Sequence, residues 1–162
     1  MNLVARKLES LSNITHTVHG VLDGSRDTLI QVVGFAGEYR VGSSGEDDAA
    51  YMRGVVLASM ASWDVACLIL DFSRLDYSWG YGLLGVIEAA SALSDSDSDG
   101  SMPFPAFVVV SERSREGIDS LLKSAPESSE EVVFDDLDTA ITAGVRAVGE
   151  FLETTDPAAL KK

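Results

Sequence analysis

The sequence is poor in cysteine, in basic residues and in long hydrophobic runs, and each shortage excludes a class of protein. Its 162 residues include a single cysteine, so no intramolecular disulfide can form. Twelve Lys and Arg are outnumbered by 26 Asp and Glu, for a formal net charge of −14, and nucleic acid and anionic lipid bind through clustered cations that are missing here. No apolar run approaches the ~20 residues of a membrane span, and no apolar leader follows Met1. We therefore expect a cytoplasmic protein with neither nucleic acid nor membrane as its partner.

The chain does have enough apolar sequence for one folded core. Hydrophobic residues make up 46% of it, and its length fits one domain of roughly 100–200 residues. Cys67 lies within the aliphatic run "VACLILDF", so we interpret it as a core side chain and not as a reactive thiol. We expect an N-terminal extension over residues 1–14, one domain over 15–152 and a flexible tail over 153–162.

The hydrophobic patterns predict strands that alternate with helices. A β-hairpin is expected over 15–35, and "VACLILDF", "FPAFVVVS" and "EVVF" are typical of buried strands. Helices are expected over 49–61, 83–93, 114–123 and 135–153, with Ser44, Ser78, Ser114 and Asp135 as N-caps. The order ββαβαβαβα predicts an α/β fold: a mixed, mostly parallel β-sheet with an N-terminal hairpin and with helices packed on it.

An acidic, serine-rich loop over residues 94–103 contains half of a calcium motif. In "DSDSDG", the carboxylates of Asp95, Asp97 and Asp99 occupy the first ligand positions of an EF-hand loop. The last position falls on Ala106, which has no carboxylate, and nearby prolines oppose the helix that should follow. We predict no metal site, and weak calcium binding by this loop stays open.

The stretch "DFSRLDYSWGYGLL", residues 71–84, runs from the end of a buried strand into a helix. Ligand sites of open α/β sheets lie at such junctions, but this one offers rings and glycines in place of a phosphate loop or a catalytic triad. Because Trp and Tyr are enriched at binding hot spots, we predict a non-catalytic, cofactor-free site for a partner, formed by Asp71, Tyr77, Ser78, Trp79, Gly80, Tyr81 and Gly82. The alternative that Trp79 and Tyr81 fill the core stays open.

The segment "CLILDFSRLDYSWGYGLLGVIEAASAL" resembles the central strand, loop and helix of STAS domains, the family of anti-sigma factor antagonists. The resemblance rests on "LDFS" and on the order of elements from Thr15 to Phe151. In that family the loop ends in Asp-Ser-Ser-Gly, whose serine accepts a phosphate. Here Tyr81 or Trp79 stands at the serine position, so the usual phospho-switch is missing; Ser78 and Tyr81 stay open as phosphorylation sites.

The resemblance implies a STAS-like regulatory module of bacterial signalling and transcription regulation that docks a protein. The partner would be an anti-sigma factor, a kinase or a similar protein, or a second copy in a homodimer. Two alternatives stay open: a small-ligand or lipid-binding α/β module, and an enzyme with Asp71, Asp76 or Glu38 as its base. An interaction module predicts an exposed apolar patch without a deep cavity, whereas a ligand-binding module predicts a pocket of a few hundred cubic ångströms lined by the rings.

Overall fold

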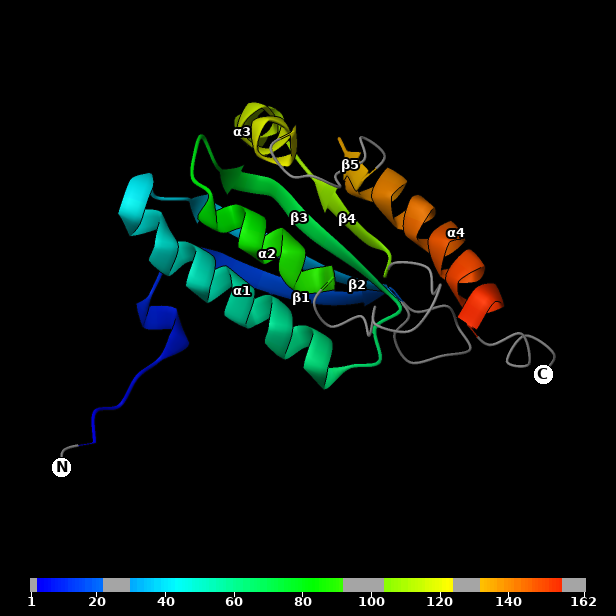
Figure 1. Cartoon of the computed structure of the whole chain (residues 1–162), viewed down its shortest axis with the longest axis horizontal. Coiled ribbons are helices and arrows are strands. Elements are labelled where there is room, and N and C mark those ends of the chain that lie inside the picture. Colours follow the sequence, from blue (N-terminus) through cyan, green and yellow to red (C-terminus); the bar gives the residue numbers. More distant parts are fainter. Residues whose placement is uncertain (1–2, 22–29, 92–103, 124–131, 156–162) are drawn as a thin grey trace.

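The described part of the chain is an α/β fold built on one mixed sheet (Figure 1). The computed structural model describes residues 3–21, 30–91, 104–123 and 132–155. Within these ranges, five strands form a sheet in the order β1-β2-β3-β4-β5. The strands are β1 (Thr15–Val21), β2 (Ile30–Glu38), β3 (Cys67–Asp76), β4 (Ala106–Val109) and β5 (Val133–Phe134). Among these described strands, only the β1–β2 pair is antiparallel, which confirms the predicted hairpin and mostly parallel sheet.

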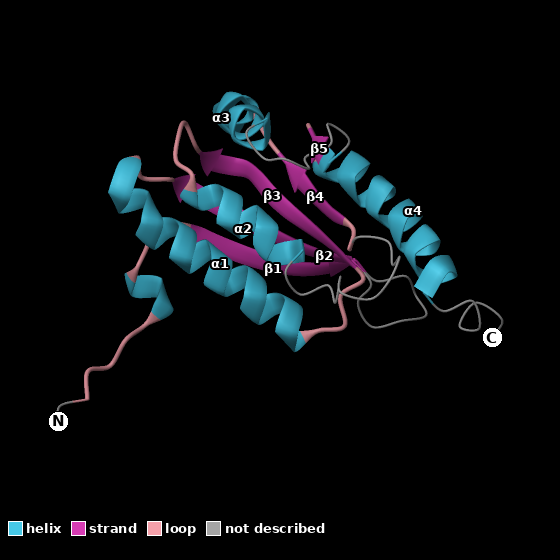
Figure 2. Ribbon diagram, in the orientation of Figure 1, coloured by secondary structure: helices cyan, strands magenta, loops and turns pink. Residues whose placement is uncertain are grey.

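Helices cover both faces of this sheet. Those in the described ranges are α1 (Gly45–Ser62), α2 (Gly82–Ser91), α3 (Glu112–Lys123) and α4 (Leu137–Thr155), with short 3-10 turns at Leu8–Ser10 and Gly42–Ser44. The first three helices each connect neighbouring parallel strands, and right-handed crossovers place such helices on one face. Figure 2 shows α1 and α2 side by side over that face, with α4 apart from them.

Each face of the sheet has its own hydrophobic core, because successive strand residues point to opposite sides. The core under α1, α2 and α3 includes Phe35, Leu68, Leu70, Phe72 and Tyr77. The core under α4 includes Ile30, Val32, Cys67, Ile69 and Val109. Cys67 is fully buried, and burial raises the pKa of its thiol to about 12. This position confirms that Cys67 is a core residue.

The end of the expected N-terminal extension is joined to the body of the fold. Ile14 is buried in the larger core, and Leu11 packs against the same core. The guanidinium of Arg40 donates a hydrogen bond to the carbonyl oxygen of Leu11 at 2.7 Å and binds the buried carboxylate of Asp48. Residues 11–14 therefore pack against the same core as the strands and helices.

Ser44 occupies the N-cap position of α1, as predicted, but makes no capping hydrogen bond through its side chain. The expected caps of α3 and α4 are wrong. Ser114 is buried inside α3, where its hydroxyl donates to a carbonyl oxygen of β3 at 3.2 Å. At α4, the carboxylate that accepts the hydrogen bond from the N–H of Thr139, at 2.8 Å, belongs to Asp136 and not to Asp135. The sequence showed polar residues at these helix starts, but not which side chain turns back to the backbone.

Some expectations concern parts of the chain beyond the described ranges. The acidic loop with Asp95, Asp97 and Asp99 lies outside the described residues, whereas α4 continues to Thr155, into the expected tail. Within the described ranges, no three metal-ligating side chains gather into a cluster. None of the described helices combines the length and the apolar character needed to cross a membrane.

Candidate functional site

The strand that leads into the candidate site is longer than the sequence pattern indicated. β3 continues to Asp76. The pattern did not show this continuation, because a bulge interrupts the alternation of side chains: Asp71 and Arg74, three residues apart, pair with residues of β2 that are two apart. The Asp71 carboxylate accepts a hydrogen bond from the N–H of Ser73 at 2.9 Å and thus stabilises the bulge. The turn into α2 therefore begins at Tyr77, beyond this bulge.

The structure separates Asp71 from the other residues of the predicted site. Asp71 follows Ile69 by two positions, so it shares the sheet face on which Ile69 packs with α4. Tyr77 belongs to the core on the opposite face. Asp71 and Tyr77 therefore lie toward opposite faces of the sheet.

Tyr77 supports this turn from below and offers little surface of its own. Its side chain is buried, and its hydroxyl donates to the carbonyl oxygen of Gly80 at 2.6 Å. Its ring packs edge-to-face on Tyr39, with 5.2 Å between the ring centroids. Burial raises the pKa of Tyr77 to about 12.

Trp79 and Tyr81 instead point into solvent. Their exposed fractions are 55% and 69%, and their rings meet edge-to-face with 5.9 Å between centroids. The alternative in which both rings fill the core is therefore wrong. The glycines explain the outward orientation: Gly80 has a φ of 148°, and a β-carbon at Gly82 would lie 2.8 Å from the hydroxyl oxygen of Tyr39. The backbone at these two glycines thus packs closely against Tyr39, and the rings of Trp79 and Tyr81 remain exposed to solvent.

Ser78 is exposed at the start of the same turn. It is not the N-cap of α2, because that helix begins at Gly82, four residues later. Its hydroxyl is therefore not committed to a helix start.

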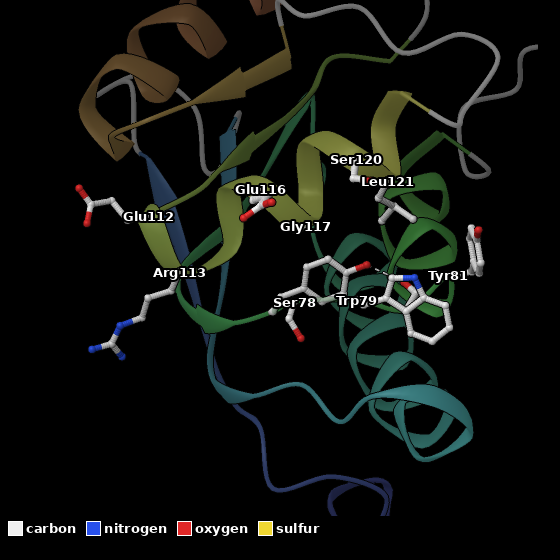
Figure 3. A pocket seen from close by; sticks show the side chains of 11 residues that line it. Ser78, Trp79, Tyr81, Glu112, Arg113, Glu116, Gly117, Ser120 and Leu121 are labelled. Atoms are coloured by element: carbon white, nitrogen blue, oxygen red, sulfur yellow. Dashed lines mark hydrogen bonds between the residues drawn. The ribbon is translucent and has the colours of Figure 1, made fainter.

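A groove of about 460 Å³ lies between this turn and α3 (Figure 3). Residues 77–81 form one wall, and α3 forms the other with Glu112, Arg113, Glu116, Gly117, Ser120 and Leu121. The turn wall comprises five residues of the predicted site; Gly82 and Asp71 do not line the groove. The α3 wall was not predicted from the sequence.

Gly117 explains how closely α3 approaches the turn. A β-carbon at this position would lie 2.8 Å from Cδ1 of the Tyr77 ring and 3.0 Å from the carbonyl oxygen of Ser78. Glycine in a helix interior costs about 1 kcal/mol relative to alanine, so a mid-helix glycine often marks close packing. Gly117 is thus a sequence signal that could have indicated the second wall, although the prediction from sequence did not use it.

Negative charge predominates on the α3 wall. Within the described ranges, neither Glu112 nor Glu116 forms an ion pair, whereas Arg115 pairs with Asp119 at 3.8 Å and also with Asp135. Figure 3 shows the side chains of Glu112 and Arg113 directed away from the rings, and Glu116 on the next turn of the helix.

The carboxylates of the enzymatic alternative lie outside the groove. Glu38 and Asp76 are paired residues of β2 and β3, both exposed, and neither they nor Asp71 line the groove. What the groove brings together is ring surface, hydroxyl groups and the charges of α3. This arrangement suits the binding of a protein partner or a ligand.

No protein-family model matches this chain, and no match was found among curated proteins. The resemblance to STAS domains therefore rests on the "LDFS" motif and on the order of elements.

Proposed function

We propose that this chain is a non-catalytic module that docks a protein partner on the 77–81 turn and the facing side of α3. The observation that carries the proposal is the outward position of Trp79 and Tyr81 on a buried support. Rings of this size contribute large apolar area at low entropic cost. Truncation of such a hot-spot side chain typically costs about 2 kcal/mol or more of binding free energy.

The STAS resemblance indicates the kind of partner. Members of that family dock kinases and anti-sigma factors at the corresponding strand-to-helix junction, so we propose a regulatory protein of this class and a cytoplasmic role. Because an aromatic side chain stands at the phospho-acceptor position, docking would not follow the family's serine switch, which adds about two negative charges at the helix start. The proposed docking therefore depends on the exposed surface of the turn and not on a phosphorylated serine.

A small-ligand module is the second candidate, and the groove volume favours it. About 460 Å³ falls in the range of ligand pockets, roughly 300–1,000 Å³. Such pockets enclose most of their ligand, however, and the rings that should enclose it here are more than half exposed. Protein docking accounts for the groove and for the exposed rings together.

Affinity capture from lysate of the native cell tests this proposal. The wild-type chain is compared with a Trp79→Ala, Tyr81→Ala double variant and with Trp63→Ala, which removes a tryptophan of similar exposure (51%) at the end of α1. We expect the captured partners to disappear with the double variant and to remain with Trp63→Ala. Recovery of the same partners by all three chains would overturn the proposal.

A further inference from the structure

The turn wall of the groove offers aromatic ring surface and the α3 wall offers carboxylate, and both of these attract a cation. We propose that the groove holds a cationic side chain, Arg or Lys, of an extended segment of the partner protein, between the indole of Trp79 and the carboxylate of Glu116. This inference rests on the proposed function and specifies the chemistry of the partner at the same site.

The ring wall suits a cation. The Trp79 and Tyr81 rings meet at 69° and so do not stack on each other's faces, which leaves ring surface open to solvent. A cation within about 6 Å of a ring centroid is attracted by the negative face of the ring, and Trp attracts it most strongly.

The helix wall supplies the negative charge. Glu116 lines the groove and forms no ion pair within the described ranges. Arg115, the cation beside it in sequence, is already paired with Asp119 and Asp135. Arg113 also lines the groove, but its guanidinium is directed away from the rings (Figure 3). A guanidinium or ammonium group from outside would therefore meet an unneutralised carboxylate.

The size of the groove and the charge of the chain point to a segment of another protein. A volume of about 460 Å³ exceeds that of one side chain and leaves room for the backbone that carries it, near the hydroxyl groups of Ser78 and Ser120. A second copy could offer its own Arg6 and Lys7, but two chains of net charge −14 repel each other. A basic segment of a different protein meets no such repulsion.

The test uses the full chain with Trp63→Phe, which leaves Trp79 as its only tryptophan. The indole N–H resonance and the fluorescence of Trp79 are followed during titration with acetyl-Ala-Ala-Arg-Ala-Ala-amide. The control peptide carries citrulline, a neutral isostere, in place of arginine. We expect saturable binding of the arginine peptide, with about fivefold weaker binding of the citrulline peptide. We expect Glu116→Gln to weaken binding of the arginine peptide by about the same factor. Glu88→Gln, which removes an exposed carboxylate from α2, should leave the affinity within about twofold.

Each result decides for or against the inference. Equal binding of the two peptides, or equal effects of the Glu116 and Glu88 variants, overturns it. If Trp79→Ala, Tyr81→Ala abolishes partner capture while Glu116→Gln retains it and the arginine peptide fails to compete, the cation inference falls and the proposed function stands. If the ring variant retains its partners, the proposed function itself falls. If light scattering shows a dimer, and the double variant Arg6→Gln, Lys7→Gln is a monomer, the occupant is a second copy and the assignment to another protein is overturned.

Discussion

Gly117 of α3 lies against the ring of Tyr77 so closely that a β-carbon at the glycine would approach the ring to 2.8 Å. Tyr77 is buried and its hydroxyl is hydrogen-bonded to Gly80, so its ring cannot move away from Gly117 without disturbing the turn. The contact joins the two walls of the groove, 40 residues apart in sequence. The width of the groove therefore depends on the lack of a side chain at Gly117.

Gly117→Ala should destabilise the protein. Overpacking of a buried contact typically costs about 1–3 kcal/mol, which outweighs the roughly 1 kcal/mol that alanine gains over glycine in a helix. Gly149→Ala is the matched control, because this glycine lies in α4 with open space around it, and the change should stabilise the chain. Urea denaturation measures both free energies of unfolding. Stabilisation by both substitutions would show that α3 does not rest on Tyr77.

Tyr77→Phe should lower the free energy of unfolding by about 1 kcal/mol, because the hydrogen bond to Gly80 is lost. Tyr81→Phe, on the exposed ring, should change stability by less than about 0.5 kcal/mol.

The alkaline pH dependence of stability should also report on Tyr77. Burial raises the pKa of Tyr77 to about 12, above its ordinary value of 10. The folded state thus keeps this proton more tightly than the unfolded state. The stabilisation is fully present below pH 10 and is lost as the pH rises toward 12. Tyr77→Phe should reduce that loss, measured as the urea midpoint between pH 9 and pH 11, and an unchanged slope would contradict the assigned burial.

Asp48 should couple stability to acid pH. Burial alone would raise the pKa of Asp48, but hydrogen bonds from Arg40 and Ser12 overcome this effect and lower it. A lowered pKa means that the stabilisation is present above the unfolded value of about 3.9 and is lost as the pH falls through the folded value. Asp48→Asn should cost about 2 kcal/mol near neutral pH and flatten this acid dependence. Asp47→Asn, on an exposed neighbour, should do neither.

Cys67 should be inert in the native protein. Its thiol is buried and its pKa is raised by that burial, so little thiolate is available to react. We expect a disulfide reagent such as DTNB to label the chain only in denaturant. Labelling at the same rate without denaturant would place Cys67 outside the core.

Local patterns sufficed for the sheet and its helices, and they failed where distant residues decide the structure. The run "VACLILDF", from Val65 to Phe72, predicted a buried strand. The pattern did not show that the strand continues to Asp76, because a bulge breaks the alternation. The aromatic turn was predicted as a site because its rings are unusual at such a junction. The direction of those rings depends on Tyr39, a residue of another loop, and no local pattern reveals that contact.

The surroundings of Asp71 and of α3 show the same limit. Asp71 was grouped with the turn because both lie near the end of β3 in sequence, but the alternation of the strand sends its side chain to the α4 face. The amphipathic pattern of α3 marks which residues are buried, such as Ile118 and Leu122, but not which neighbour they meet. Only Gly117 carried a hint of the second wall.

The most direct test of the docking proposal is the accessibility of the Trp79 indole in the Trp63→Phe protein. Acrylamide quenching of its fluorescence is measured for the chain alone and after addition of the partner recovered by affinity capture. We predict strong quenching in the free protein, since more than half of the side chain is exposed, and clear protection when the partner is bound. An indole that is shielded in the free chain, or equally quenched with and without the partner, would contradict the proposal that this protein works through the rings of its 77–81 turn.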